Sequence, residues 1–269
     1  MFDIDLLKDR VAVVIGAGSC GPGWGNGKAS ALSFARAGAK VVAVDVNQAA
    51  ASETASLIEA EGHAAAAFQA DVASSEALRQ MTAWTMEKYG QIDILHYNVG
   101  IVVQGGCVEL EEEKWTRAFH VNVTGFFLAC KHILPIMEKQ RRGVIITTGS
   151  FAAVRWTGVN YMSYYATKSA LIQLTRGIAM EYARKGLRAV SILPCLMNTP
   201  MIYASNLEDA YAGGDVQKMV AVRDAQCPTG KMGDAWDVAN AAVFLASDAA
   251  KYITATELLV DGGISAKVS

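Results

Sequence analysis

Short runs of apolar residues recur along the chain, separated by stretches long enough to form helices. Several runs are apolar at nearly every position, which is typical of strands buried on both faces of a parallel sheet. Repeated strand–helix–strand units running in one direction give a doubly wound sheet. We therefore predict an α/β fold with a seven-stranded, mainly parallel sheet and helices on both faces. The predicted strands are Val11–Ile15, Val41–Val44, Ala64–Phe68, Ile92–Tyr97, Gly143–Thr148, Leu187–Leu193 and Glu257–Val260.

The patterning favours one domain. The chain has 269 residues, of which 52% are hydrophobic, so it can bury a large core. No Pro- or Ser-rich linker, charge block or internal repeat divides it. We therefore treat residues 1–269 as a single domain. The stretch from Pro200 to Pro228 breaks the alternation of strands and helices, and we expect a helical insertion or substrate lid at about residues 200–228.

The charge balance and the composition exclude several classes of partner. The formal net charge is −2, so no basic face for nucleic acid is expected. No apolar run reaches the ~18 residues of a membrane span, and the four histidines have no metal-ligand spacing. The five cysteines are far apart, which indicates reduced thiols. With an N-terminus unlike a signal peptide, these features favour the cytoplasm.

A glycine-rich segment, Gly16 to Gly27, follows the first predicted strand, and six of its twelve residues are glycine. A strand, a glycine-rich turn and a helix can hold a pyrophosphate, because glycine lets the backbone approach the phosphates and the helix N-terminus presents free N–H groups. Two registers are possible. The phosphate-binding glycines are either Gly16, Gly21 and Gly23 or Gly16, Gly25 and Gly27.

Helix chemistry favours the second register. Pro22 cannot lie inside a helix, whereas the residues from Lys28 onward are good helix formers as far as Gly38. The helix should therefore begin near residues 25–27, with residues 20–24 as an inserted loop. The predicted cofactor-binding residues of this turn are Gly16, Gly25, Asn26 and Gly27.

An acidic residue, Asp45, follows the second predicted strand. A carboxylate in this place can bind both hydroxyls of an adenosine ribose and would repel a 2′-phosphate, which favours NAD over NADP. The alternative interpretation is that Asp45 caps the helix beginning near Asn47.

Tyr164 and Lys168 are four residues apart and share one face of a predicted helix. The ordinary tyrosine pKa of about 10 is too high for efficient acid–base work at neutral pH, and a nearby ammonium group lowers it. Ser150 follows a predicted strand, at the edge where active sites of such sheets open. Its hydroxyl can orient a substrate oxygen beside the tyrosine.

Further short motifs accompany these residues: "DV" at 71–72, "NVG" at 98–100, "VNVTG" at 121–125, "YYATK" at 164–168 and "VDGG" at 260–263. Together with the glycine loop, Asp45 and Ser150, the set resembles the short-chain dehydrogenase/reductase family over nearly the whole chain. The resemblance implies a Rossmann fold, NAD as cofactor and a small-molecule substrate. The implied activity interconverts a secondary alcohol and a ketone.

The resemblance also implies a role for each matched residue. Tyr164 would be the general acid/base, Lys168 would bind the nicotinamide ribose, and Ser150 would hydrogen-bond the substrate oxygen. Asn122 would hold a water molecule that relays the proton to bulk solvent. Besides Tyr164, Lys168, Asp45 and the glycine loop, the implied cofactor contacts are Asp71, Val72, Asn98, Gly100, Pro194 and Thr199.

The sequence departs from the family pattern at several positions. Ile15 replaces the usual threonine before the first glycine, Tyr97 replaces an asparagine and Cys195 replaces a glycine after proline. The glycine loop is also about five residues longer, by the register argued above. None of these changes removes a catalytic group, but they make it unsafe to transfer a substrate from common members.

Three tyrosines compete for the catalytic role. Tyr161 is seven residues before Lys168, a spacing that with a long glycine loop resembles the enoyl-reductase branch of the superfamily, whose members reduce a C=C bond. Tyr164 is favoured because Ser150 and Asn122 stand where carbonyl-reducing members have them. Tyr165 would point about 100° away from Tyr164 around the helix.

Substrate specificity should depend on residues after Ser150, after Pro194 and in the lid. These are mostly apolar and aromatic, which favours a ring or a chain as substrate. Arg155 either pairs with a substrate carboxylate or is exposed at a subunit surface, and Trp24 either covers the cofactor or packs on Trp156. The predicted substrate-binding residues are Ser150, Ala152, Arg155, Trp156, Tyr161, Leu196 and Tyr203.

Two alternatives to the alcohol dehydrogenase remain at this point. One is the enoyl reductase, and the other is a binding protein that senses a dinucleotide without turnover. Because members of the family are usually tetramers or dimers, the resemblance implies a homotetramer or homodimer.

Overall fold

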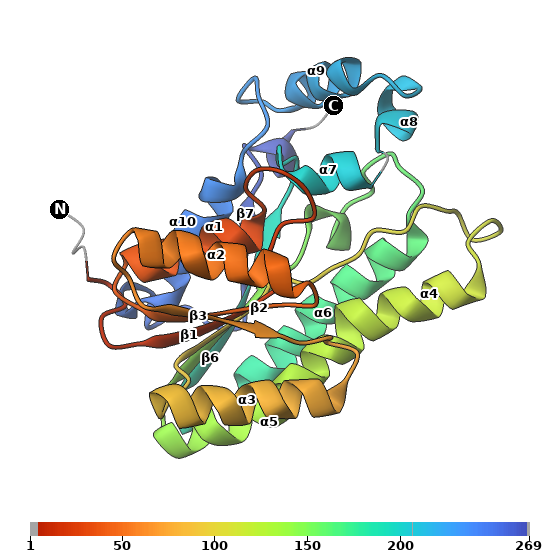
Figure 1. Ribbon diagram of the computed structural model, residues 1–269. Coiled ribbons are helices and arrows are strands. Elements are labelled where there is room, and N and C mark those ends of the chain that lie inside the picture. The colour runs from red at the N-terminus through yellow and green to blue at the C-terminus, as the bar shows by residue number, and fades with distance from the viewer. Residues whose placement is uncertain (1–4, 206, 268–269) are drawn as a thin grey trace.

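Seven parallel strands form one sheet in the computed structural model, which describes residues 5–205 and 207–267 (Figure 1). The strand order is β3-β2-β1-β4-β5-β6-β7, and every neighbouring pair is parallel. All seven predicted strands are present, so the predicted Rossmann-type fold is confirmed. Their bounds are β1 Val11–Ile15, β2 Lys40–Asp45, β3 Ala65–Gln69, β4 Ile94–Tyr97, β5 Gly143–Thr148, β6 Leu187–Pro194 and β7 Glu257–Val260.

The strand order reverses direction between β1 and β4, because β2 and β3 lie on one side of β1 and the later strands on the other. The strands β1 and β4 at this point are buried at every position; the continuous apolar run of β1 predicted this, and β4 buries His96 as well. In parallel sheets of this kind, ligands bind outside the carboxyl ends of the strands at the point of reversal. The topology therefore places a binding site beyond Ile15 and Tyr97.

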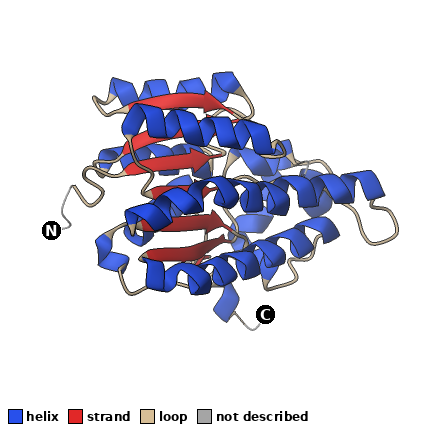
Figure 2. Cartoon of the chain, turned by 90° about the horizontal axis from the view of Figure 1, so that it is seen from below, coloured by secondary structure: helices blue, strands red, loops and turns tan. Residues whose placement is uncertain are grey.

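Helices cover both faces of the sheet (Figures 1 and 2). The helices α1 (Asn26–Arg36), α2 (Gln48–Ala60) and α10 (Ala235–Ala246) share one apolar core with the sheet. A second core on the opposite face includes α3 (Ser75–Tyr89), α5 (Gly125–Gln140) and α6 (Met162–Tyr182). The helix α4 (Glu112–Phe119) continues into α5 through a π-helical turn, His120–Thr124.

Three short helices replace the regular pattern between β6 and α10. They are α7 (Pro200–Ala204), α8 (Leu207–Ala212) and α9 (Val216–Gln226), and they gather beyond the carboxyl ends of the strands in Figure 1. Their apolar residues form a separate cluster with residues around the start of α6. The segment predicted as a lid is thus helical and lies at the edge where the binding site is expected.

The glycine loop packs tightly between β1 and α1. Its Trp24 lies against Trp236 of α10, with ring centroids 4.7 Å apart, rather than against Trp156. A Cβ on Gly27 would overlap the carbonyl oxygen of Gly16 and lie 2.6 Å from Nδ2 of Asn98. Gly27 therefore permits the close approach of α1 to the end of β1.

Gly27→Ala should destabilise the fold by about 3 kcal/mol, because the backbone of Gly16 cannot move away without displacing β1. Gly177→Ala is the matched control, since Gly177 is an exposed residue of α6 with open space around its Cβ position. The control should be stabilised by about 0.5–1 kcal/mol. Urea denaturation of both variants measures the difference, and equal midpoints would contradict the packing described for Gly27.

Candidate active site

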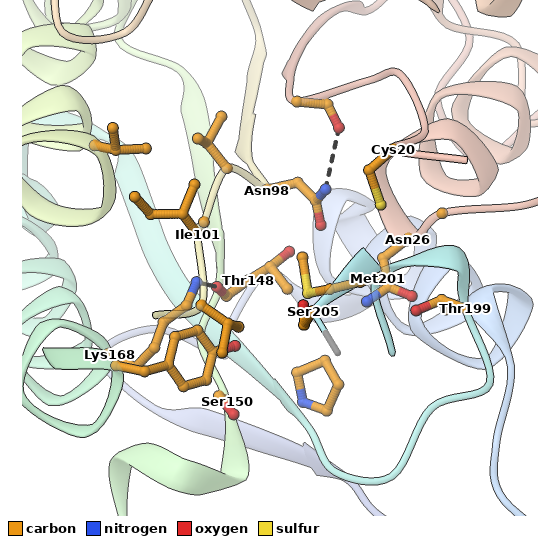
Figure 3. Close-up of a pocket in the computed structure, with 18 of the residues that line it drawn as sticks. Cys20, Asn26, Asn98, Ile101, Thr148, Ser150, Lys168, Thr199, Met201 and Ser205 are labelled. Carbon is orange, nitrogen blue, oxygen red and sulfur yellow. Dashed lines mark hydrogen bonds between the residues drawn. The ribbon is translucent and has the colours of Figure 1, made fainter. Parts of the chain in front are cut away.

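A cavity of about 1200 Å³ opens at the carboxyl edge of the sheet. It exceeds the roughly 300–1,000 Å³ usual for one small ligand, which leaves room for a cofactor and a substrate together. Most of the sequence-predicted site residues line it: Gly16, Gly25, Asn26, Asp45, Asp71, Val72, Asn98, Gly100, Ser150, Ala152, Tyr161, Tyr164, Lys168, Pro194, Leu196 and Thr199. Figure 3 shows Lys168, Thr148 and Ser150 on one side of this space and Cys20, Asn26 and Thr199 on the other.

The glycine loop presents the N-terminus of α1 to the cavity. The helix begins at Asn26 with Gly25 as its N-cap residue, as predicted, and no side chain caps it. The first N–H groups of a helix lack partners within the helix and attract anions. The Oδ1 atom of Asn26 is also buried without a hydrogen-bond partner. The free N–H groups, which are donors, fit the phosphates of a dinucleotide.

The second register of the glycine loop agrees with this geometry. Gly16 and Gly25 line the cavity, whereas Gly21 and Gly23 approach Pro200 and are not among its lining residues in the described chain. Gly27 does not line the cavity either, because it is used in the contact with Gly16 described above. Of the inserted loop, Gly21 and Gly23 lie toward Pro200 of α7 and Trp24 packs on Trp236, whereas Cys20 lines the cavity.

Asp45 holds the glycine loop from the end of β2. Its Oδ2 accepts a hydrogen bond of 3.0 Å from the N–H of Gly18, and its Oδ1 accepts one of 3.0 Å from the N–H of Asn47. The cap of α2 is Asn47, whose side chain accepts from Ala49 and Ala50. Helix capping is therefore not the role of Asp45, and its partly exposed carboxylate lines the cavity.

Lys168 is buried at the floor of the cavity and 2% exposed. Its Nζ donates a hydrogen bond of 2.8 Å to the carbonyl oxygen of Thr148, drawn as a dashed line in Figure 3. A Cβ on Gly100 would lie 2.9 Å from the same Nζ, so a larger residue there would displace the end of the lysine side chain. Burial lowers the pKa of Lys168 to about 8, so the group is mostly protonated at neutral pH.

Tyr164 lies one helical turn before Lys168, whose Nζ is 5.6 Å from the centroid of the tyrosine ring. Burial raises the pKa of Tyr164, and a hydrogen bond with Ser150 opposes that rise. The opposing contribution thus comes from Ser150, whereas the sequence assigned it to Lys168.

The two competing tyrosines are engaged elsewhere. The hydroxyl of Tyr161 is in a short hydrogen bond with Thr157 Oγ1, and burial raises its pKa. The hydroxyl of Tyr165 accepts from the N–H of Thr157 and donates to the carbonyl oxygen of Val159. Tyr161 and Tyr164 both line the cavity, and it is the pKa of Tyr164 that the neighbouring hydroxyl of Ser150 lowers. The geometry favours Tyr164 as the proton donor.

Asn122 is buried in the π-helical turn behind the cavity wall. Its Oδ1 accepts from the N–H of Ile101 at 2.8 Å, and its Nδ2 donates to the carbonyl oxygen of Ile101 and to Oγ1 of Thr167. The side chain therefore fixes the loop after β4 against α6. Asn122 does not itself line the cavity, unlike the neighbouring His120 and Val121.

Three predicted substrate residues lie away from the cavity lining. Arg155 is exposed and its Nη1 donates to the backbone carbonyl of Val154. Trp156 is 59% exposed and stacks on Tyr165. The hydroxyl of Tyr203 donates to Asn198 on the exposed side of α7. Each lies within three positions of a residue that does line the cavity (Ala152, Thr157 or Ile202), and a shift of a few positions in a loop or short helix turns the side chain outward.

Sequence reasoning missed a set of polar residues that the structure brings to the cavity. Residues of α4 and the following turn line one side, and Arg223 of α9 lines the lid side. No motif marked them, because they are separated from the family motifs in sequence and meet the cavity through packing of α4 and α9. The missed polar residues include Glu112, Glu113, Thr116, Arg117, His120, Thr157 and Arg223, and also Ser19, Asn47, Thr148 and Ser205.

Among the described residues, no cluster of three His, Cys, Asp or Glu side chains is placed to hold a metal ion. Within the same part of the chain, no helix has the length and apolar character needed to cross a membrane.

The comparisons with known proteins agree with this site. Residues 23–265 match the protein family described as enoyl-(acyl carrier protein) reductase. The chain is 37% identical over 262 residues to 2,5-dichloro-2,5-cyclohexadiene-1,4-diol dehydrogenase LinX of Sphingobium indicum, covering 97% of this chain and 98% of LinX. It is 36% identical over 264 residues to 3beta-hydroxysteroid dehydrogenase 1 of Eggerthella lenta, covering 97% of this chain and 95% of that protein.

Solved structures show the same likeness. A putative short-chain dehydrogenase/reductase from Burkholderia xenovorans has a TM-score of 0.93 and 43% identity, covering 98% of this chain and 100% of that one. Similar structures with 26% and 29% identity are a xylitol dehydrogenase bound to NAD⁺ and a gluconate 5-dehydrogenase from Burkholderia cenocepacia in complex with NADP and tartrate.

The fold and the site are those of a dinucleotide-dependent oxidoreductase. The chain belongs to the short-chain dehydrogenase/reductase family, whose members use NAD(P).

Asn122→Ala should destabilise the protein by about 2 kcal/mol, because it leaves the partly buried N–H and carbonyl groups of Ile101 without their partners. Thr167→Val removes one of the hydrogen bonds of Asn122 while conserving volume, and should cost about 1 kcal/mol. Thermal or urea unfolding of the two variants measures the difference. Equal losses would show that Asn122 does not hold the Ile101 loop.

Proposed function

We propose that this protein is an NAD-dependent dehydrogenase that interconverts a secondary alcohol and a ketone, with Tyr164 as general acid/base. The observation that carries the proposal is that Ser150, Tyr164 and Lys168 line one cavity, with the buried ammonium group of Lys168 lying 5.6 Å from the centroid of the Tyr164 ring. A substrate oxygen placed between the two hydroxyls would accept a proton from one and a hydrogen bond from the other.

The residues of the other half of the cavity fit a dinucleotide. The N-terminus of α1 with Gly16, Gly25 and Asn26 would hold the pyrophosphate. Asp45 would bind the adenosine ribose, Asp71 and Val72 would flank the adenine, and Asn98 and Gly100 would line the cleft. Lys168 would meet the nicotinamide ribose, and Pro194 and Thr199 the nicotinamide end. When bound, the dinucleotide would supply or accept the hydride.

Proton transfer is the task of the protein itself. Because burial raises the pKa of Tyr164, its hydroxyl is protonated at neutral pH and is ready to donate to a carbonyl oxygen. In the oxidation direction the same group must first lose its proton, which the ammonium of Lys168 and the hydroxyl of Ser150 assist by stabilising the phenolate. Asn122 fixes the backbone behind them and would position the water that exchanges the proton.

A C=C reductase is the second candidate, because the matched family is described as enoyl-(acyl carrier protein) reductase. That activity would use Tyr161, whose hydroxyl is bound to Thr157. Relatives such as LinX and the steroid dehydrogenase carry dehydrogenase names, which supports the alcohol chemistry. A dinucleotide sensor without turnover is disfavoured by the presence of Tyr164, Lys168 and Ser150 in one wall of the cavity.

The same proposal includes a lid at residues 200–228 and a homo-oligomer in the cytoplasm. The outer faces of α4, α5 and α6 expose Trp115, Phe127 and Met180, with Met180 70% exposed. Exposed large apolar side chains on neighbouring helices support burial against a second copy.

Tyr164→Phe should lower turnover of secondary alcohols by about 10³-fold, because the variant keeps the ring but has no proton to exchange. NAD binding should be retained. The measurement is reduced-nicotinamide absorbance across a panel of cyclic, aromatic and aliphatic secondary alcohols. Tyr161→Phe and Tyr165→Phe are the controls and should keep most of the activity. If only Tyr161→Phe lost activity and the protein reduced C=C bonds, the enoyl-reductase activity would replace this proposal.

Asp45 should make NAD the preferred cofactor, with kcat/KM at least about tenfold above that for NADP, because the carboxylate repels a 2′-phosphate. Asp45→Ser should narrow this ratio. It should also weaken the binding of NAD, since the variant loses the carboxylate that accepts a hydrogen bond from the N–H of Gly18. Asp71→Asn is the control, because Asp71 lines the cavity beside the adenine position and should leave the ratio unchanged. A wild-type preference for NADP would refute the assignment of Asp45.

A further inference from the structure

Arg223 is a buried cation in the wall of the active-site cavity. It lies on α9 in the lid segment, is 5% exposed and is one of the residues that line the cavity. Its Nε donates to Sδ of Met232 at 3.2 Å, and its guanidinium carbon is 5.2 Å from the ring centroid of Tyr211. The side chain is therefore held in place by a thioether and an aromatic ring.

No counter-charge accompanies Arg223. Within residues 5–205 and 207–267, no carboxylate oxygen lies within the 4.0 Å ion-pair distance of its guanidinium group. The adjacent Asp224 is engaged by the backbone N–H of Met232, which donates to its Oδ1 at 2.8 Å. By contrast, buried Lys28 has an ion pair with Glu53. Arg223 thus differs from a structural buried cation.

A buried charge without a partner is costly, and proteins usually pair it. A cation–π contact with Tyr211 offsets part of this cost. The remaining cost of burying the charge is tolerable when the guanidinium group faces a space that an anion occupies during function. A carboxylate entering the cavity would restore the missing charge through two parallel N–H···O bonds, the geometry that a guanidinium group favours.

The surroundings of Arg223 belong to the substrate end of the cavity. Met232 and Cys227, which touch it, are members of one apolar cluster with Ala152 and Tyr161, and Tyr164 and Tyr211 pack against that cluster. The phosphate cradle is built by other elements, the end of β1 and the start of α1. Arg223 is therefore on the side of the proton donor.

The number of cations favours a carboxylate over a more highly charged anion. Of the described residues that line the cavity, the lysines and arginines are Arg117, Lys168 and Arg223. Lys168 donates to Thr148, and Arg117 lies on α4, across from the lid. One guanidinium group in an apolar and aromatic wall matches a single negative charge on a ring or chain.

We propose that Arg223 binds a carboxylate of the substrate, so that the enzyme acts on a secondary alcohol or ketone that also carries a carboxylic acid. This inference rests on the proposed dehydrogenase function. Arg155, which the sequence offered for this task, is exposed and turned to the backbone of Val154.

The test uses benzoate and benzamide, which share shape but differ in charge. Calorimetric titration of the NADH-saturated protein should show benzoate binding at least about tenfold more tightly than benzamide, the effect expected of a charge-assisted pair. Arg223→Gln should bring the two dissociation constants together. Arg223→Lys should keep part of the preference, and Arg155→Gln, the matched control, should keep all of it.

Folding is checked in each variant by a cooperative thermal transition with a midpoint no lower than that of the wild type, and by a dissociation constant for NADH that matches the wild type. Equal binding of benzoate and benzamide by the wild type, or a preference unchanged in Arg223→Gln, would overturn the proposal. A large loss of NADH affinity in Arg223→Gln would also overturn the proposal, because it would show that Arg223 binds the cofactor rather than the substrate. Absence of NADH binding or alcohol turnover in the wild type would count against the proposed function, and the benzoate titration without NADH would still decide the anion site.

Discussion

The buried ammonium group of Lys168 is the contact on which the active site depends. It ties α6 to the end of β5 through the carbonyl of Thr148, and it lies against the loop after β4, where Gly100 leaves room for it. Because Tyr164 is one turn earlier on the same helix, this contact also fixes the position of the phenol. Burial of the cation lowers its pKa, which is tolerated because the carbonyl oxygen satisfies the charge.

The parallel sheet brings the remaining groups to the same edge. Asp45 ends β2, Ser150 follows β5 and Pro194 ends β6, so residues about 150 positions apart face one cavity. The loop glycines then decide how closely α1 approaches this edge. Gly27 sets that distance through its contact with Gly16, while Asp45 holds the other end of the loop through the N–H of Gly18. The cofactor half of the site is thus determined by backbone packing more than by side chains.

The sequence predicted well those features that depend on local chemistry. The seven strands were visible as apolar runs, and the start of α1 followed from Pro22 and the helix formers after Lys28. The start of the helix follows from backbone hydrogen bonding within a few residues, and each strand is marked by its own apolar composition although its hydrogen bonds go to distant strands. The face of a helix that meets the cavity is instead set by tertiary packing. Arg155 and Arg223 are both arginines near the expected pocket, and only the docking of α9 on the lid cluster shows that Arg223 lines the cavity.

The separate apolar cluster of the lid has a consequence for how the protein can change. Its buried members, such as Ile202, Met219 and Met232, belong neither to the core under α1 nor to the core under α5. Substitutions among them would therefore reshape the space above Tyr164 without disturbing the packing that supports the sheet and the glycine loop. The two cores packed on the sheet can therefore stay unchanged while the separate cluster varies. A new substrate specificity can arise by substitutions in that cluster alone.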